Sequence, residues 1–543
     1  MRDACLIEQT SSGVACEHYA TVLDRIFARD DIVLVAAGGL SCLRPLYFKA
    51  LSLGKLEQCM FCMMSLGDYA TGGAEKVLAD TVRNAASRPC TRCVIIYVSC
   101  AEILSQCDFD AIERQGASRG VTIRALYRGP LTARRGNVLE QLDDTLEKIP
   151  EGDSPRIAEE AFQLPPLPPD FSGIASLLQG WDAYPVLLTA GGCSSSVSIS
   201  DVFNGTIRLD HSRFNDIEIA RGCEQPAIAG ISRAYQLQNH RLCCLLGSPV
   251  MEMTGLDFTG TQAELEALGI PTLHCPSDGF EPAQVGIARA LLALAKRLLS
   301  DDVQEHPPFV NVMGCTSLGF GSRDILNNGT EILKSLGMQV RVWGEDSLEC
   351  ASSAGAALFN WVVAAEGMPA ADYMKARFGT PAVVGIPLSG ADSKLFCERA
   401  VVPGHGVRLL QSSRNPSPGS AKAVLIGQPL TIISLGNYLV ENMDLTVDYA
   451  LYAPTVALRD LFAPFTEGQQ AVRIFSTFEQ LEKLAVGADA VLADPLLLEV
   501  LRRAGSKSQL IELPDSMVGG SHSLLTDSVI ETAVRALCYS LKR

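Results

Sequence analysis

The sequence predicts an α/β protein of several doubly wound parallel sheets, with the N-terminal domain duplicated in tandem. Short apolar runs alternate with amphipathic segments along the chain, and three strings of the first 150 residues recur in order after a proline-rich segment. Continuous apolar strands that alternate with helices are typical of parallel sheets covered on both faces. The length of 543 residues, with 47% hydrophobic and 20% charged residues, fits several globular domains and excludes disordered or collagen-like chains.

The apolar runs and the helical spacings predict the elements in chain order. The strands expected from buried runs are 32–37, 94–98, 309–313, 339–343, 423–426, 490–492 and 509–513. The helices expected from apolar periodicity are 19–27, 137–148, 284–299, 324–336, 478–484 and 496–503. Gly38 and Gly39 follow the first strand and predict a glycine turn there.

The repeated strings predict two related units on either side of a linker. Segment 149–173 is rich in proline, which indicates a stiff extended connection. The matched pairs are 32–42 with 185–195, 71–76 with 220–225, and 94–109 with 241–258. A repeat of this length indicates duplicated whole domains and not a solenoid. The expected organisation is a first copy at 1–150, a linker at 151–173, a second copy at 174–304, and Rossmann-like domains at 305–420 and 421–543.

Charge and motif content exclude several function classes. The net charge of −16 and the lack of Lys/Arg clusters argue against binding to nucleic acid. No run of 18 apolar residues is present, so no transmembrane helix is expected, and the N-terminus has no apolar signal core, so a cytoplasmic location is expected. The sequence has no phosphate-binding loop, no Gly-x-Gly-x-x-Gly after a strand and no serine-hydrolase elbow. Any ATP-driven electron supply must therefore come from a partner.

The chain has 18 cysteines, half of them between Cys5 and Cys107. The Cys59/Cys62 and Cys90/Cys93 pairs are too far apart for a usual zinc ribbon, and the first pair lies in an apolar run. Cys42 and Cys100 each follow a strand, where the carboxyl ends of parallel strands gather at one edge of a sheet.

Cys16 opens the first amphipathic helix, and Cys5 lies upstream of it. Thiolates that converge on one point suit an iron–sulfur cluster. The alternative reading is that these cysteines pack in the core as small apolar side chains.

With these residues in view, the chain resembles the nitrogenase component 1 superfamily, which includes nitrogenase α and β subunits, cofactor-assembly scaffolds and dark-operative protochlorophyllide reductases. The strings that carry the resemblance are AAGGLSC at 36–42, YATGGAEKVL at 69–78, VSCAEI at 98–103, GSPVMEMTGLDFTG at 247–260, DGF at 278–280, VNVMG at 310–314, GEDSLE at 344–349, ALFNWV at 357–362 and FGTPAVVGIPLSG at 378–390. Their shared order covers nearly the whole chain.

The resemblance implies a [4Fe–4S] cluster held at the meeting point of two such units. The family uses three cysteines per subunit, and the matching positions are Cys16, Cys42 and Cys100, with Cys5 as the alternative first ligand. Cys193, or a ligand from outside the chain, is the expected fourth ligand.

The second unit departs from this pattern. The position of Cys42 is taken there by Ser195, and that of Cys100 by Ser248 or Pro249. The two units are expected to pair about a pseudo-twofold axis, as two subunits do in the family.

The resemblance also sets expectations for partners and chemistry. Ala364 stands where the iron–molybdenum cofactor has its cysteine ligand, so no such cofactor and no dinitrogen reduction are expected. The expected role is an anaerobic iron–sulfur oxidoreductase component that accepts electrons from an ATP-dependent iron-protein-type reductase, with catalysis around 314–318 and 387–390. The alternatives are a non-catalytic scaffold for a metal cofactor or tetrapyrrole, and a subunit that pairs with a second component 1 chain or with itself. The family spans several substrates, so the resemblance leaves the substrate open.

Overall fold

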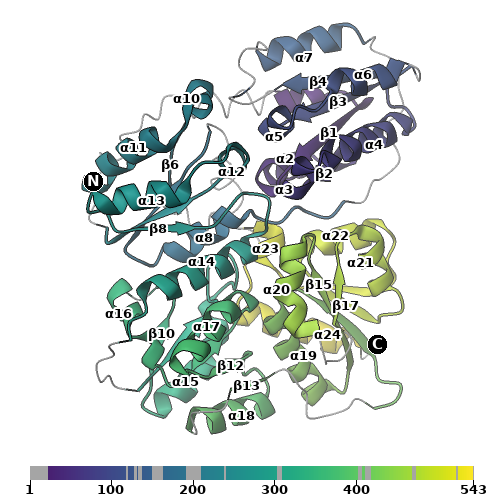
Figure 1. Cartoon of the computed structure of the whole chain (residues 1–543). Helices are drawn as coiled ribbons and strands as arrows, with labels where there is room; N and C mark the ends of the chain where they lie inside the picture. Colours follow the sequence, from purple (N-terminus) through teal and green to yellow (C-terminus); the bar gives the residue numbers. More distant parts are fainter. Residues whose placement is uncertain are drawn as a thin grey trace.

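The computed structural model describes residues 22–117, 120–127, 131, 137–149, 163–190, 209–237, 240–301, 308–345, 347–401, 406–409, 417–466, 472–520 and 524–541. Four sheets organise these residues, two of four strands and two of five (Figure 1). Every strand pairing within these four sheets is parallel. The predicted α/β class with several parallel sheets is confirmed.

The first sheet is built on a strand that is buried along its whole length, because the run IVLVAAG offers apolar side chains to both faces. Its strands are β1 (Ile32–Gly38), β2 (Cys59–Met63), β3 (Cys93–Val98) and β4 (Thr122–Tyr127), in the order β2-β1-β3-β4. Its helices are α2 (Leu40–Ser52), α3 (Leu66–Ala70), α4 (Gly73–Ser87), α5 (Cys100–Leu104), α6 (Phe109–Ala117) and α7 (Val138–Glu147). Each face of the sheet has its own hydrophobic core.

The second sheet repeats this strand order as β6-β5-β7-β8. Its strands are β5 (Ala183–Leu187), β6 (Asp210–His211), β7 (Leu242–Leu246) and β8 (Thr272–Cys275). Its helices are α8 (Asp170–Leu178), α10 (Asp216–Arg221), α11 (Glu224–Gln236), α12 (Pro249–Thr254), α13 (Phe258–Ala267) and α14 (Ala283–Leu298). The shared order agrees with a tandem duplication, which stays a prediction.

Both five-stranded sheets have their first strand inside the sheet, so the strand order reverses there. The third sheet has the order β10-β9-β11-β12-β13 and the fourth β16-β15-β14-β17-β18. The strands are β9 (Phe309–Met313), β10 (Gln339–Val342), β11 (Asn360–Val362), β12 (Ala382–Val384), β13 (Val407–Arg408), β14 (Lys422–Ile426), β15 (Thr446–Tyr452), β16 (Val472–Phe475), β17 (Ala490–Ala493) and β18 (Gln509–Glu512). The helices are α15 (Asn327–Ser335), α16 (Leu348–Ser352), α17 (Met368–Phe378), α18 (Gly390–Val401), α19 (Pro429–Met443), α20 (Val456–Thr466), α21 (Phe478–Ala485), α22 (Pro495–Arg503), α23 (Ser516–Gly519) and α24 (Asp527–Leu541).

Two of the described elements differ from their expected bounds by more than one residue at an end. The single helix expected at 324–336 is a 3₁₀ turn, Arg323–Leu326, followed by α15. Helix α8 begins at Asp170, inside the segment expected to be extended, because the proline run ends at Pro169 and that residue caps the helix. Among the described residues, none of the helices is long and apolar enough to cross a membrane.

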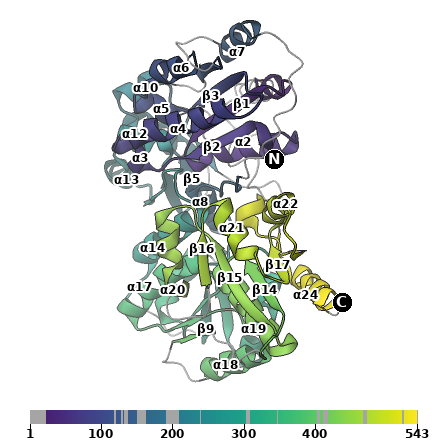
Figure 2. The same cartoon turned by 90° about the vertical axis from the view of Figure 1, so that its right-hand side faces the viewer.

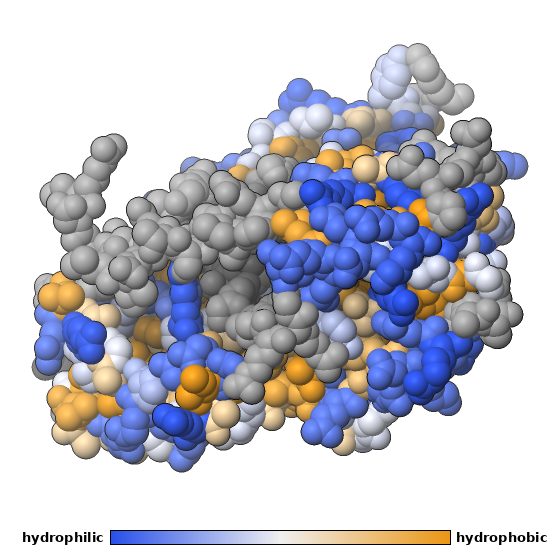
Figure 3. Space-filling view, turned by 90° about the horizontal axis from the view of Figure 1, so that it is seen from above, coloured by the Kyte–Doolittle hydropathy of each residue, from blue (hydrophilic) through white to orange (hydrophobic). Residues whose placement is uncertain are grey.

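The two four-stranded sheets lie side by side at one end of the molecule and the two five-stranded sheets at the other (Figures 1 and 2). One continuous hydrophobic core joins the second sheet to both five-stranded sheets, whereas the first sheet keeps separate cores. The described surface seen from the N-terminal end is largely hydrophilic, with hydrophobic residues in small groups (Figure 3). The first unit is therefore packed as a body of its own against the rest of the chain.

Candidate functional site

Two of the predicted cluster ligands lie at one edge of the first sheet. Cys42 is in the first turn of α2, just after β1, and Cys100 is the first residue of α5, just after the neighbouring strand β3. Gly38, between β1 and α2, has a φ of 142°, and a Cβ on it would lie 3.1 Å from Cβ of Cys42 and 3.5 Å from Oγ of Ser99. Both cysteines are half-buried, unlike the fully buried Cys59 and Cys93 of the same sheet.

A buried hydrogen-bonded group supports the turn that carries Cys100. Glu102 accepts from the backbone N–H of Ser99 at 2.7 Å, and Tyr69 donates its hydroxyl to the other carboxyl oxygen of Glu102. Burial raises the pKa of Glu102, and burial together with the Glu102 charge raises the pKa of Tyr69. The Tyr69 ring also packs on Phe280 of the second unit, with ring centroids 5.7 Å apart. The capping pattern Ser-x-x-Glu in VSCAEI is the signal from which Glu102 could have been found.

The two N-terminal units meet beside these cysteines through corresponding helices. Helix α5, which follows β3, contacts α12, which follows β7, the strand at the same place in the second sheet. Cys100 and Leu104 of α5 pack against the core of the second unit. Met253 of α12 packs against the core of the first unit. The contact is therefore reciprocal, as a pseudo-twofold pairing requires.

The first residues of α5 and α12 show which residue of the second unit corresponds to Cys100. Ser99 and Ser248 are the N-caps of α5 and α12, so Pro249, the first residue of α12, stands at the Cys100 position. Proline offers no metal-binding group.

The other predicted ligands, Cys5, Cys16 and Cys193, lie outside the described residues. Within the part of the chain that is described, no group of three or more His, Cys, Asp or Glu side chains is placed to hold a metal ion.

The Cys59/Cys62 pair does not form a metal knuckle. Three positions apart on β2, the two side chains point to opposite faces of the sheet and belong to different cores. Burial raises the pKa of Cys62 to about 11 and that of Cys93 to about 12. These thiols are packing residues.

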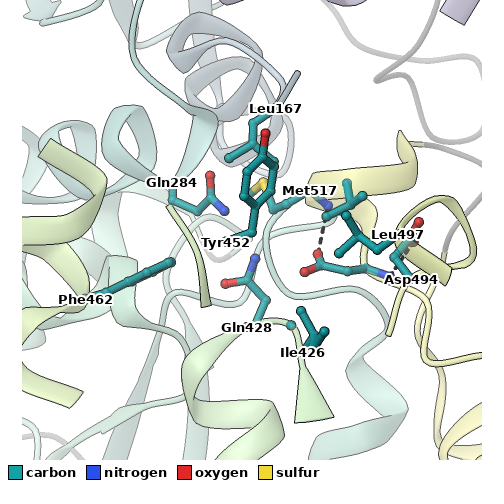
Figure 4. A pocket seen from close by; sticks show the side chains of 12 residues that line it. Leu167, Gln284, Ile426, Gln428, Tyr452, Phe462, Asp494, Leu497 and Met517 are labelled. Carbon is teal, nitrogen blue, oxygen red and sulfur yellow. Dashed lines mark hydrogen bonds between the residues drawn. The ribbon is translucent and has the colours of Figure 1, made fainter. Parts of the chain in front are cut away.

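A second site lies at the carboxyl edge of the fourth sheet, where that edge faces α14 of the second unit. Gln428 follows β14, Asp494 follows β17 and Asp515 follows β18, and these three line a small pocket with Gln284 of α14 (Figure 4). Ala364, after β11, lies against Gly314, after β9, since a Cβ on Gly314 would be 3.1 Å from that of Ala364. Sequence reasoning missed the pocket because its residues come from separate segments. Residues 314–318 and 387–390, expected at the catalytic cleft, are absent from its lining.

A comparison with known protein families finds one model that matches part of the chain. Residues 174–398 match the family model described as nitrogenase component 1 type oxidoreductase. This part of the chain is similar to the nitrogenase component 1 type oxidoreductases. The matched part comprises the second N-terminal unit and most of the third sheet, and the first unit lies outside it.

The curated relatives are light-independent protochlorophyllide reductase B subunits. That of Chlorobium phaeobacteroides (strain BS1) is 37% identical over 99 residues, 18% of each chain. That of Chlorobium luteolum is 34% identical over 119 residues, 21% of this chain and 22% of the relative. The match spans about a fifth of the length of these relatives.

A solved structure shares the fold. Nitrogenase Cp1 at pH 6.5 matches with a TM-score of 0.51 and 13% identity, over 74% of this chain and 96% of that one. At this identity the likeness shows the fold alone, over most of the chain.

Proposed function

We propose that this chain is a nitrogenase-like oxidoreductase component that holds one [4Fe–4S] cluster between its two N-terminal units and accepts electrons from an ATP-dependent iron-protein-type reductase. The observation that supports it most is the pair Cys42 and Cys100. They follow neighbouring strands and are half-buried, and Cys100 packs against the core of the second unit.

The donor set fits such a cluster. Iron–sulfur clusters take thiolate ligands, and Cys42 and Cys100 are thiols at one sheet edge with partial access to solvent. Cys16 or Cys5 would supply the third ligand, and Cys193 or a group from outside the chain the fourth. A bound cluster would pass single electrons. Glu102 holds the Ser99 backbone, and with it the start of α5, in place.

The two units contribute unequally to the proposed ligand set. Pro249 at the position of Cys100 cannot ligate iron, so the first unit supplies three of the proposed ligands, and the second unit supplies at most Cys193 together with the covering surface. The chain thereby contains both halves of an interface that separate subunits make in the family.

The substrate is proposed to be an unsaturated organic molecule and not dinitrogen. Ala364 provides no ligand for an iron–molybdenum cofactor, and the curated relatives are named for the reduction of protochlorophyllide. The non-catalytic scaffold remains the competing proposal. ATP turnover that requires both this chain and an iron-protein-type reductase supports the enzyme, and stable cofactor binding without turnover supports the scaffold.

Anaerobic purification of the full chain, followed by iron and acid-labile sulfide assays and electron paramagnetic resonance after dithionite reduction, tests the cluster. About four iron and four sulfide per chain with a reduced-cluster signal is the expected result. A folded protein that stays free of iron after anaerobic reconstitution would overturn the proposal.

A further inference from the structure

A tight turn of the second unit is inserted into the first unit beside the cysteine-bearing edge. This turn comprises residues 278–280, follows β8 and has the sequence Asp-Gly-Phe, with Gly279 at a φ of 76°. Phe280 is 2% exposed, and its side chain belongs to a hydrophobic core of the first unit. The second unit therefore places one of its own aromatic rings inside the first unit.

Buried Asp170 fixes the conformation of this turn from within the second unit. Its side-chain oxygens accept from the backbone N–H of Asp278 at 2.7 Å and from that of Gly279 at 2.9 Å. The backbone N–H of Asp170 also donates to the carbonyl oxygen of Glu281 at 2.8 Å. The side chain of Asp278 accepts from the backbone N–H of Phe280 at 2.8 Å, within the turn itself. Because these hydrogen bonds close on consecutive residues, the turn presents Phe280 in one position.

The first contact of the turn with the first unit is at the start of the helix that carries Cys42. The backbone N–H of Ser41 donates to the carbonyl oxygen of Gly279 at 3.3 Å. Gly39, the N-cap of α2, comes so close that a Cβ on it would lie 2.8 Å from that oxygen and 2.8 Å from the Phe280 ring. Backbone N–H groups in the first turn of a helix have no partner within the helix. An acceptor from the second unit therefore fixes where α2 begins.

The second contact leads to the turn that carries Cys100. The Phe280 ring packs on the Tyr69 ring at an interplanar angle of 53°, and the Tyr69 hydroxyl donates to Glu102. Glu102 in turn accepts from the backbone N–H of Ser99, the residue before Cys100. The position of the Phe280 ring therefore limits that of the Tyr69 hydroxyl, and through it that of the carboxyl group that orients α5.

We propose that the turn 278–280 is a positioning element, by which the second unit sets the relative placement of Cys42 and Cys100. Gly279 acts on the start of α2, and Phe280 acts on the start of α5 through the Tyr69 ring. This role rests on the proposed function, since a cluster requires its thiols at one point. It gives the second unit a part in the site although its own counterpart of Cys100 is Pro249, which offers no ligand.

Thiol reactivity in the iron-free full chain tests the positioning without any metal. The rate of alkylation by iodoacetamide is measured for each cysteine by peptide mass spectrometry, with the exposed Cys350 as internal standard. Phe280→Leu, which removes the ring contact with Tyr69, is expected to raise the rates at both Cys42 and Cys100 by about fivefold. Rates at both cysteines that stay at the wild-type value would overturn the proposal.

Two milder variants test the two ends of the path. Asp170→Asn places an amide nitrogen against one of the backbone N–H groups of the turn, and is expected to raise the rates at both Cys42 and Cys100 by about twofold. Unchanged rates there would contradict a turn that Asp170 holds in place. Tyr69→Phe keeps the ring and removes the hydroxyl, so the rate should rise more at Cys100 than at Cys42. A rise at Cys42 alone would contradict the path through the carboxyl group of α5.

A matched control separates this turn from general loosening of the second unit. Phe258→Leu makes the same truncation at a residue that is 6% exposed and lies in the separate core of the second unit. The rates at Cys42 and Cys100 should then stay at the wild-type value. A rise equal to that in Phe280→Leu would overturn the proposal.

A spectroscopic measurement on the anaerobically reconstituted chain connects the turn to the cluster. Phe280→Leu is expected to shift the g values of the reduced-cluster signal and to speed the loss of iron to a chelator, whereas Phe258→Leu should do neither. A wild-type chain without iron would overturn the cluster, while the alkylation rates would still decide whether the turn positions the thiols. Wild-type alkylation rates in an iron-loaded Phe280→Leu chain would overturn the positioning and leave the cluster standing.

Discussion

The two N-terminal units share a strand order but are joined to the molecule in different ways. The second unit contributes one sheet face to the large core, and Ser176 and Trp181 contact Ser317 and Trp343 of the third sheet, with hydroxyl oxygens 2.9 Å and ring centroids 5.7 Å apart. The first unit contributes Leu40 alone to that core. A sheet with both faces covered locally can be attached to a protein without rebuilding its core.

The difference extends to the chemistry at corresponding positions. The first unit keeps Cys100 at the start of α5, and the second has Pro249 at the start of α12. The unit that is least integrated into the core thus carries the candidate ligands, and the unit that is most integrated provides the surface against them. Four predictions test this division, from the largest expected effect to the smallest.

Substitution of a cysteine is expected to lower the amount of bound iron only when the cysteine belongs to the proposed ligands of the first unit. Cys42→Ser and Cys100→Ser are each expected to lower the iron bound per anaerobically purified chain by more than about tenfold. Cys243→Ser is the control, because Cys243 is buried in the core of the second unit. Loss of bound iron in Cys243→Ser, or an unchanged iron content in Cys42→Ser, would contradict the assignment of the ligands to the first unit.

As the pH falls, the second unit is expected to lose stability before the first unit does. Burial lowers the pKa of His274, which stacks on Phe258 at 4.4 Å, from 6.5 to about 4, and segment 22–149 of the first unit contains no histidine. The folded state favours neutral His274, so its stabilisation is present above pH 6.5 and is lost as the pH falls toward 4. The loss is at most about 3 kcal/mol.

Urea unfolding at pH 7.5 and pH 4.5 measures this effect. His274→Phe should lose less stability between the two pH values than the wild type does. An equal loss in both proteins would assign the acid sensitivity to other groups.

Adding one methyl group at the junction of the units should push them apart. A Cβ on Gly39 would lie 2.8 Å from the carbonyl oxygen of Gly279 and 2.8 Å from the Phe280 ring. Gly39→Ala is expected to cost about 1–3 kcal/mol in urea unfolding. Gly230→Ala, inside α11 with nothing within 4 Å of the new Cβ, should instead stabilise by about 0.5–1 kcal/mol.

Alanine substitutions at the contact between α5 and α12 are expected to have the smallest effects on stability. Leu104→Ala and Met253→Ala each remove a half-buried side chain from the opposite unit's core, for an expected loss of about 1–2 kcal/mol each. Hydrogen exchange measures whether protection then falls in both α5 and α12. Ile217→Ala, at a position that is 53% exposed, is the control with an expected effect near zero. A loss of protection in one helix only would show that the contact is not reciprocal.

Much of this architecture could be predicted from the sequence, because it depends on local patterns. Apolar runs located β1, β3, β9 and β14 within one residue, since a strand buried on both faces leaves a continuous signal. The choice between Ser248 and Pro249 could not be made, because it depends on where α12 begins.

The Tyr69–Glu102 hydrogen bond and the pocket lined by Gln284 and Gln428 depend on chain segments far apart in sequence. Nothing near Gln284 or Gln428 indicates that their side-chain oxygens would be buried without partners. Such features arise from the packing of whole elements, which periodicity does not encode.

Helix α2 carries Cys42 in its first turn and Arg44 two residues later, a rise of about 3 Å along the helix. Arg44 is buried and donates to the carbonyl oxygens of Pro166 at 2.5 Å and Val518 at 3.2 Å. Val518 also lines the pocket that contains Gln284 and Gln428. One rigid helix therefore spans the interval between the thiol edge and the pocket wall. The Arg44 guanidinium therefore connects the helix that carries Cys42 directly to the backbone of α23.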